Sequence, residues 1–149
     1  MSYQNLYTGR LSEPGRAYFI TTVTQHRNPI FEDINCARIV INHMRKIHDA
    51  EWVSSLSWVV MPDHVHWLFR LGDTKELSAV LKHFKARSAI ELNQALKRSG
   101  SIWQSHYYDR AIRDGEDIRQ IARYIVGNPL RAGLVKNIFH YPHWDAAWL

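Results

Sequence analysis

Two histidines separated by a single residue, His64 and His66, have the type and spacing to bind a metal ion. They open the segment 64–71 (HVHWLFRL), whose composition predicts a β-strand. Side chains alternate along a strand, so both imidazoles face the same way, about 6 to 7 Å apart along the backbone. Two imidazoles so placed can share one divalent ion, although two ordinary histidines on a half-exposed sheet have the same spacing. The neighbouring Asp63 could orient an imidazole or cap the turn before the strand.

Two imidazoles do not complete a metal site, and the last long helix that the sequence predicts offers a further ligand. Tyr124 and Asn128 are four residues apart and therefore share one face of that helix. They fall on the rim of its apolar stripe, which is made of Ile118, Ile121, Ala122 and Ile125. A side chain on the rim can point across a sheet edge toward the two histidines. A tyrosine that packs by its ring, or an asparagine that ends a helix before proline, would have the same pattern.

The elements around these residues predict an α+β fold of one domain spanning 1–149. The first half has a strand at 17–24, a helix capped by Asp33 and running to about 49, and strands at 56–61 and 64–71 joined by Pro62-Asp63. The second half begins with a helix capped within 73–76 and ended by Ser99-Gly100. A strand at 106–113 follows, and then a helix opened by 114–117 and ended or kinked at 127–129. This order matches the ferredoxin-like (split βαβ) arrangement, an antiparallel sheet with helices on one face. An extra C-terminal helix carrying Tyr124 follows it. The tail at 141–149 is expected to pack back on the domain.

Three segments together resemble a known family. They are 58–66 (WVVMPDHVH), 102–110 (IWQSHYYDR) and 124–135 (YIVGNPLRAGLV). In this order and at these spacings they resemble the single-tyrosine HUH transposases, and most closely their REP-associated tyrosine transposase branch in bacteria. The resemblance extends over nearly the whole chain, from the first strand to about residue 135.

The resemblance implies a function and a role for each candidate residue. His64 and His66 match the histidines of the HUH motif and would bind Mg²⁺ or Mn²⁺. Tyr124 matches the nucleophile, and Asn128 matches the polar residue that completes the metal site. The implied activity is nicking and rejoining of single-stranded, hairpin (REP-like) DNA through a 5′-phosphotyrosine. Two imidazoles would also hold Zn²⁺, Co²⁺ or Ni²⁺ tightly in vitro.

Composition agrees with a DNA partner without demanding one. The net charge is +5 and the pI about 9.5, which favours a polyanion. The basic residues that could line a DNA path are Lys82, Lys85, Arg87, Arg110, Arg113, Arg119, Arg123 and Arg131. Any one of them could equally be a solvated surface charge. Six Trp and seven Tyr belong mostly to the core, but some rings could stack on unpaired bases. Whether the chain is a monomer or a homodimer stays open.

Other interpretations remain at this stage. Tyr107 or Tyr108 could be the nucleophile, although adjacent residues on a strand face opposite ways, so one of them should be core. The chain could instead be a non-catalytic module that binds single-stranded nucleic acid. A zinc hydrolase is disfavoured because it needs a third strong ligand and a carboxylate base in a motif that is not found.

Several function classes are excluded by what the sequence lacks. No P-loop is present, so no nucleotide cofactor is expected. The single cysteine, Cys36, permits no internal disulfide and is expected to be buried. No run approaches the roughly 18 apolar residues of a membrane span. Residues 1–16 are polar and lack an apolar leader segment, so we expect a cytoplasmic protein with no membrane partner.

Overall fold

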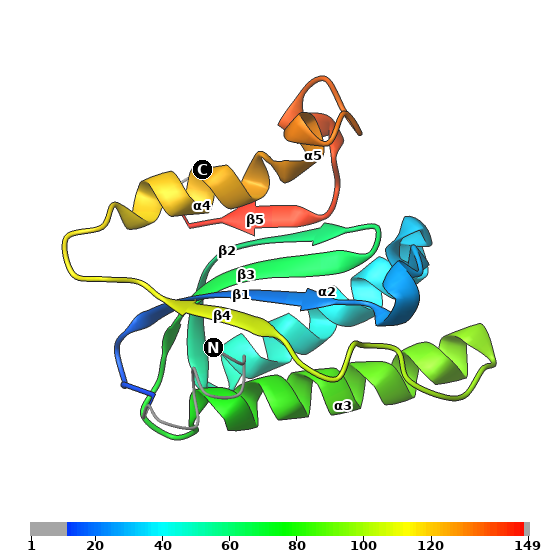
Figure 1. Cartoon of the computed structure of the whole chain (residues 1–149), viewed down its shortest axis with the longest axis horizontal. Helices are drawn as coiled ribbons and strands as arrows, with labels where there is room; N and C mark the ends of the chain where they lie inside the picture. The colour runs from blue at the N-terminus through cyan, green and yellow to red at the C-terminus, as the bar shows by residue number, and fades with distance from the viewer. Residues whose placement is uncertain (1–11, 148–149) are drawn as a thin grey trace.

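A five-stranded antiparallel sheet lies at the centre of the computed structural model, which describes residues 12–147 (Figure 1). The strands in spatial order are β4 (Tyr108–Ala111), β1 (Ala17–Val23), β3 (His64–Leu71), β2 (Val53–Met61) and β5 (Trp144–Ala146). The first four follow the ferredoxin-like order, so the predicted fold class is confirmed. Most of the segment 1–16 and the end of the tail lie outside the described residues.

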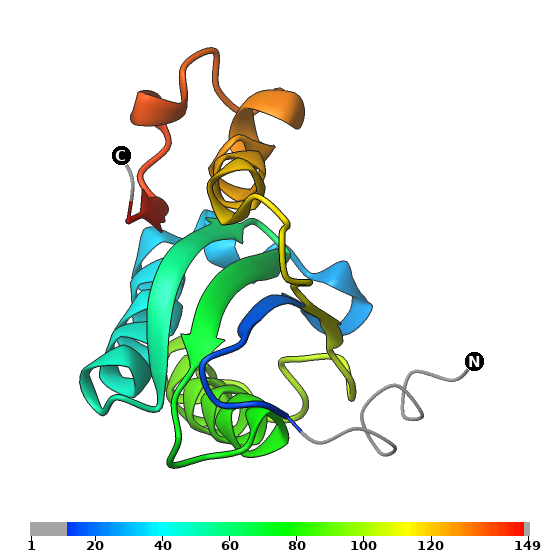
Figure 2. The same cartoon turned by 90° about the vertical axis from the view of Figure 1, so that its left-hand side faces the viewer.

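Two long helices cover one face of this sheet, as predicted (Figure 2). They are α2 (Ile34–Asp49) and α3 (Leu77–Leu96). Trp67 and Phe69 of β3 are at most 1% exposed and belong to the same core cluster as Phe84 of α3. The carboxylate of Asp33 accepts hydrogen bonds from the first backbone N–H groups of α2, which confirms its predicted capping role.

A third helix, α4 (Ile118–Val126), packs on the opposite face, mainly against β2. Its buried Ala122 and Ile125 join Val59 and Leu68 in a second core cluster. The Asp117 carboxylate caps the helix by accepting hydrogen bonds from its first backbone N–H groups. We call this second sheet face, toward which His64, His66 and Leu68 point, the histidine face.

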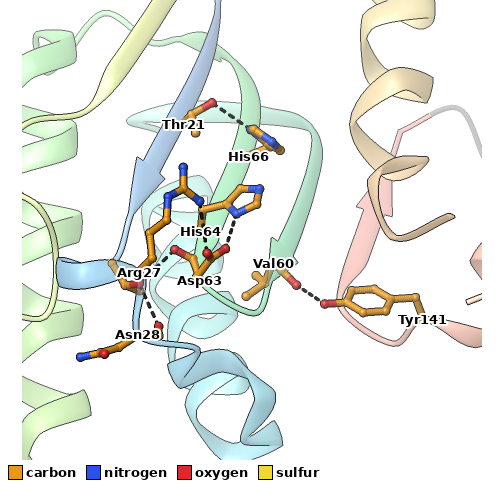
Figure 3. A network of polar contacts seen from close by, with 9 residues as sticks. Thr21, Arg27, Asn28, Val60, Asp63, His64, His66 and Tyr141 are labelled. Carbon is orange, nitrogen blue, oxygen red and sulfur yellow. Dashed lines mark hydrogen bonds and ion pairs between the residues drawn. The ribbon is translucent and has the colours of Figure 1, made fainter. Parts of the chain in front are cut away.

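The tail packs back on the domain, as expected, but as a fifth strand that the sequence did not predict. β5 pairs with β2, with Val59 opposite Trp144 and Ser57 opposite Ala146. The Tyr141 hydroxyl donates to the Val60 carbonyl at 2.6 Å (Figure 3). Burial raises the pKa of Tyr141 to about 12, so the phenol keeps the proton that this bond needs. Short helical turns complete the chain: α5 (Asn128–Arg131), η1 (Gln25–Arg27), η2 (Ile30–Glu32) and η3 (Ile138–His140).

Two helix ends differ from the sequence predictions. The capping pattern predicted within 73–76 is wrong, because Glu76 occupies the N-cap without a side-chain bond and the Ser12 hydroxyl accepts from Leu77 N–H instead. α3 ends at Leu96, earlier than predicted, where Lys97 adopts a left-handed conformation.

The helix predicted to carry both Tyr124 and Asn128 ends between them. α4 stops before Gly127, and Asn128 begins the separate helix α5. The chain keeps near-helical angles at Gly127 (φ −77°, ψ −5°), so the two side chains are one turn apart but belong to different helices.

β4 is shorter than the predicted 106–113, and β2 begins three residues earlier than expected. Within residues 12–147, no helix has both the length and the apolar character required to cross a bilayer.

Candidate metal and nucleophile site

The two histidines of β3 lie side by side on the histidine face. Their ring centroids are 4.7 Å apart and their planes meet at 75°. Val65 and Trp67, which alternate with them, are buried on the side of α2 and α3. The structure therefore gives the pair the shared direction that a common metal ligand set requires.

Each imidazole is held through its Nδ1 atom (Figure 3). His64 Nδ1 lies 2.7 Å from the carboxylate of Asp63, and His66 Nδ1 lies 2.8 Å from the hydroxyl of Thr21 on β1. Arg27 donates to the other carboxylate oxygen of Asp63 at 3.1 Å. These contacts orient both rings and leave Nε2 of each as the nitrogen that would bind a metal.

The electrostatics at His66 favour the neutral form, which ligates metals. Burial, followed by the positive charges of His64 and Arg131, lowers the pKa of His66 to about 3. His66 is therefore neutral near pH 7, as a metal ligand must be. Burial raises the pKa of Asp63, but the hydrogen bonds from His64 and Arg27 outweigh it, and the net pKa lies below the ordinary value. The carboxylate is thus ionised and can accept both bonds.

The donors around these histidines do not suit a closed structural zinc site. Within the described part of the chain, no group of three or more His, Cys, Asp or Glu is placed to hold a metal. An amide oxygen is the remaining candidate: Asn128 uses its Nδ2 to donate to the Ile125 carbonyl at 3.1 Å, which leaves its Oδ1 as an acceptor. If this oxygen joined the two imidazoles, the set would leave positions for oxygens of a bound phosphate, as Mg²⁺ or Mn²⁺ would require.

Tyr124 lies on the outer rim of α4 and is 57% exposed. It lines an open groove of about 540 Å³ together with Phe19 and Arg110. The Phe19 ring packs edge-on against the His66 ring, with centroids 5.4 Å apart. The groove therefore extends from Tyr124, the candidate nucleophile, to Phe19, which contacts the candidate ligand His66.

Tyr107, just before β4, and Tyr108, its first residue, differ in burial, so one of them is core, as predicted. Tyr107 is buried in the cluster beneath α2 and α3. Tyr108 is 49% exposed and stands opposite Thr21, which in turn stands opposite His66. Directly paired residues share a sheet face, so Tyr108 lies on the histidine face and stays a possible nucleophile.

A family model described as "Transposase IS200 like" matches residues 15–128, from just before β1 to Asn128. The chain belongs to the IS200-like transposase family. The resemblance seen in the sequence is thereby confirmed, and the chain is an enzyme of the transposase class.

Individual relatives agree with this placement. A REP-associated tyrosine transposase of Escherichia coli is 30% identical over 100 residues, which is 61% of this chain and 55% of that protein. A Haemophilus influenzae protein provisionally named as such a transposase is 26% identical over 141 residues, 87% of this chain and 78% of its own length.

Two solved structures share the fold. A REP-associated tyrosine transposase bound to a REP hairpin superposes with a TM-score of 0.74 at 24% identity, covering 91% of this chain and 79% of that one. A structure described as a transposase candidate from Deinococcus radiodurans gives a TM-score of 0.56 at 23% identity, covering 73% of this chain and 87% of that one.

The basic residues that the sequence offered as a DNA path fall into two groups in the structure. Lys82, Lys85 and Arg87 lie on α3, on the side of the sheet away from the histidine face. The Lys85 ammonium donates to the backbone carbonyls of Gln104 and His106, so it has a structural partner. The others lie on β4, α4, α5 or the loop between β4 and α4: Arg110, Arg113, Arg119, Arg123 and Arg131.

Sequence reasoning missed Thr21 and Arg27, which hold His66 and Asp63. Thr21 is 45 residues from His66 in the chain, and only the pairing of β1 with β3 brings them together. A threonine within a β-branched strand carries no separate signal for this role. Asp63 was recognisable because it is adjacent to His64.

The contacts that Asp63 and Thr21 make with the two imidazoles predict how metal affinity responds to mutation. Asp63→Asn and Thr21→Val each remove the group that orients one imidazole, so each should lower Mn²⁺ affinity about 10- to 100-fold. Calorimetric titration of Mn²⁺ measures this, with the thermal midpoint checking the fold. Asp49→Asn, at the exposed end of α2, is the matched control and should bind Mn²⁺ like the wild type. Unchanged affinity in both test variants would show that the Nδ1 contacts do not serve a metal site.

Proposed function

We propose that the protein nicks and rejoins single-stranded DNA at hairpins, using a divalent metal ion and a tyrosine nucleophile. The observation that carries the proposal is the histidine pair, whose Nδ1 atoms are both occupied while both Nε2 atoms stay available on the histidine face. A hairpin substrate is suggested by the solved relative described as bound to a REP hairpin. A DNA substrate also fits the cytoplasmic location expected from the sequence.

In this proposal His64, His66 and Asn128 would hold Mg²⁺ or Mn²⁺, with DNA oxygens completing the coordination. When bound, such an ion neutralises charge on the scissile phosphate and orients it for in-line attack. Thr21 and Asp63 contribute by fixing the two rings, so that little reorganisation is needed when DNA arrives.

Tyr124 would act as the nucleophile. Its hydroxyl oxygen forms a bond to phosphorus while the bond from phosphorus to the 3′ oxygen breaks. The phenol loses its proton, and the departing 3′ oxygen gains one to become a free hydroxyl. The product is a 5′-phosphotyrosine, which keeps the energy of the broken bond and needs no ATP. A 3′ hydroxyl can attack this linkage in the reverse sense and join two strands.

The competing interpretation is a module that binds nucleic acid without cutting it. Such a module needs neither an exposed tyrosine beside the groove nor two histidines with their Nδ1 atoms held. A covalent protein–DNA adduct therefore separates the two functions.

The first prediction concerns the nucleophile. Labelled hairpin DNA incubated with the wild type and Mn²⁺ should give an adduct that survives a denaturing gel. Tyr124→Phe removes only a hydroxyl from an exposed ring, so it should keep the fold and hairpin binding but form no adduct. Tyr108→Phe, which also removes one hydroxyl from an exposed ring, is the matched control and should form the adduct normally. The reverse pattern would assign the reaction to Tyr108.

The second prediction concerns the third ligand. Asn128→Ala removes the amide oxygen, so the Mn²⁺ concentration for half-maximal adduct formation should rise about tenfold or more, while hairpin affinity stays near that of the wild type. A Mn²⁺ titration of the reaction rate measures this. Asn128→Asp keeps an oxygen donor and should retain most of the metal response. If alanine leaves the titration unchanged, another group completes the site.

The third prediction concerns where DNA lies. Hairpin binding should weaken steeply with salt because phosphate contacts release counterions. If DNA approaches the histidine face, Arg119→Gln on α4 should reduce the slope of log affinity against log salt by about 1. Arg87→Gln, an exposed arginine on α3, should leave the slope unchanged. Fluorescence anisotropy at several salt concentrations measures both. A lower slope for Arg87→Gln alone would place DNA on the other side of the sheet.

A further inference from the structure

Arg131 folds back from α5 onto the end of α4 and contacts Tyr124 in two ways. Its guanidinium carbon lies 3.9 Å from the centroid of the Tyr124 ring. Its Nη2 also donates a hydrogen bond to the backbone carbonyl of Tyr124, seven residues earlier in the chain. A planar guanidinium can stack on a ring and donate from its edge at the same time, which a lysine ammonium cannot do.

Gly127 leaves the space that this contact needs. A Cβ atom at Gly127 would lie 2.7 Å from Nη1 of Arg131, too close for both to stay where they are. The backbone angle at Gly127 (φ −77°) is open to any residue, so backbone conformation gives no reason for a glycine here. The reason for a glycine is instead the space that the Arg131 guanidinium occupies beside it.

Tyr124 is a side chain that needs such a contact. An exposed ring on a helix exchanges between rotamers when nothing holds it. Burial cannot hold it, because a nucleophile must remain accessible to DNA. The Arg131 guanidinium covers one side of the ring and leaves the other side open.

We propose that Arg131 is a positioning residue, which stacks on Tyr124 and holds its ring in the orientation from which the hydroxyl reaches the scissile phosphate. This inference rests on the proposed function of Tyr124. It assigns Arg131 a role different from that of the other basic residues, which would act, if at all, by contacting DNA.

The test compares Arg131→Gln, Arg131→Lys and the control Arg123→Gln, an exposed arginine adjacent to Tyr124 in sequence. For each, the rate constant of adduct formation is measured in single turnover at saturating hairpin and Mn²⁺. Hairpin affinity is measured over a range of salt. In parallel, 3-fluorotyrosine is placed at position 124 of the full chain and its ¹⁹F resonance recorded without DNA.

Loss of the stacked contact should misplace the phenol, so Arg131→Gln should lower the rate constant about 10- to 100-fold. Arg131→Lys keeps the charge but should recover little of the rate. Hairpin affinity and its salt slope should match the wild type in both. The ¹⁹F resonance should move in both Arg131 variants and in Gly127→Ala, which fills the space beside the guanidinium, and stay in place in Arg123→Gln.

Three results would overturn the inference. Full recovery of the rate by lysine would show that charge alone matters. A salt slope reduced by about 1 with an unchanged rate at saturation would make Arg131 a phosphate contact. A ¹⁹F resonance that does not move would show that the contact does not hold the ring.

The proposed function can fail separately. A wild type that forms no adduct overturns the proposed reaction, whatever the ¹⁹F spectra show. If the wild type forms the adduct and both Arg131 variants form it at the wild-type rate, only the positioning role is overturned.

Discussion

The two-residue period of β3 gives one strand two environments that cannot be exchanged. Val65, Trp67 and Phe69 point into the cluster under α2 and α3 and are at most 1% exposed. His64 and His66 point the other way, where their polar atoms meet Thr21 and Asp63. A slip of one residue would bury both imidazoles in an apolar core and expose the indole of Trp67. The free energy of burying Trp67 and Phe69 therefore fixes the direction of the histidines.

The opposite face is only partly covered, and this makes a site possible there. α4 has nine residues and lies mainly over β2, where Ala122 and Ile125 meet Val59 and Leu68. The histidines at the start of β3 are therefore half-buried: shielded enough to keep His66 neutral, yet not sealed. A strained turn also contributes to the hydrogen bonds around His64. His26 and Arg27 both have positive φ (56° and 52°), a conformation that side chains rarely adopt, and Arg27 there reaches Asp63.

Features that depend on local sequence could be predicted, and features that depend on distant pairing could not. β3 was predicted with its observed bounds because alternation and the Pro62-Asp63 turn lie within a few residues of one another. β5 was missed because it has three residues and exists only by pairing with β2. Thr21 was missed for the same reason. The shared helical face of Tyr124 and Asn128 assumed one continuous helix, whereas the chain starts a new helix at Asn128.

The nucleophile proposed at Tyr124 would face two opposed requirements, and the C-terminal half of the chain offers different groups for each. The hydroxyl must stay open to DNA, so the ring cannot be held by burial. The helix that carries it is instead anchored by its other face, through Ile125 in the core and through the Ser57 hydroxyl, which donates to the Ala122 carbonyl at 3.1 Å. That bond gives the buried Ser57 hydroxyl a partner, and it ties α4 to the strand next to β3. With the helix axis fixed in this way, only the side-chain torsions of Tyr124 remain free. The Arg131 guanidinium on the ring is the contact that we propose restricts them.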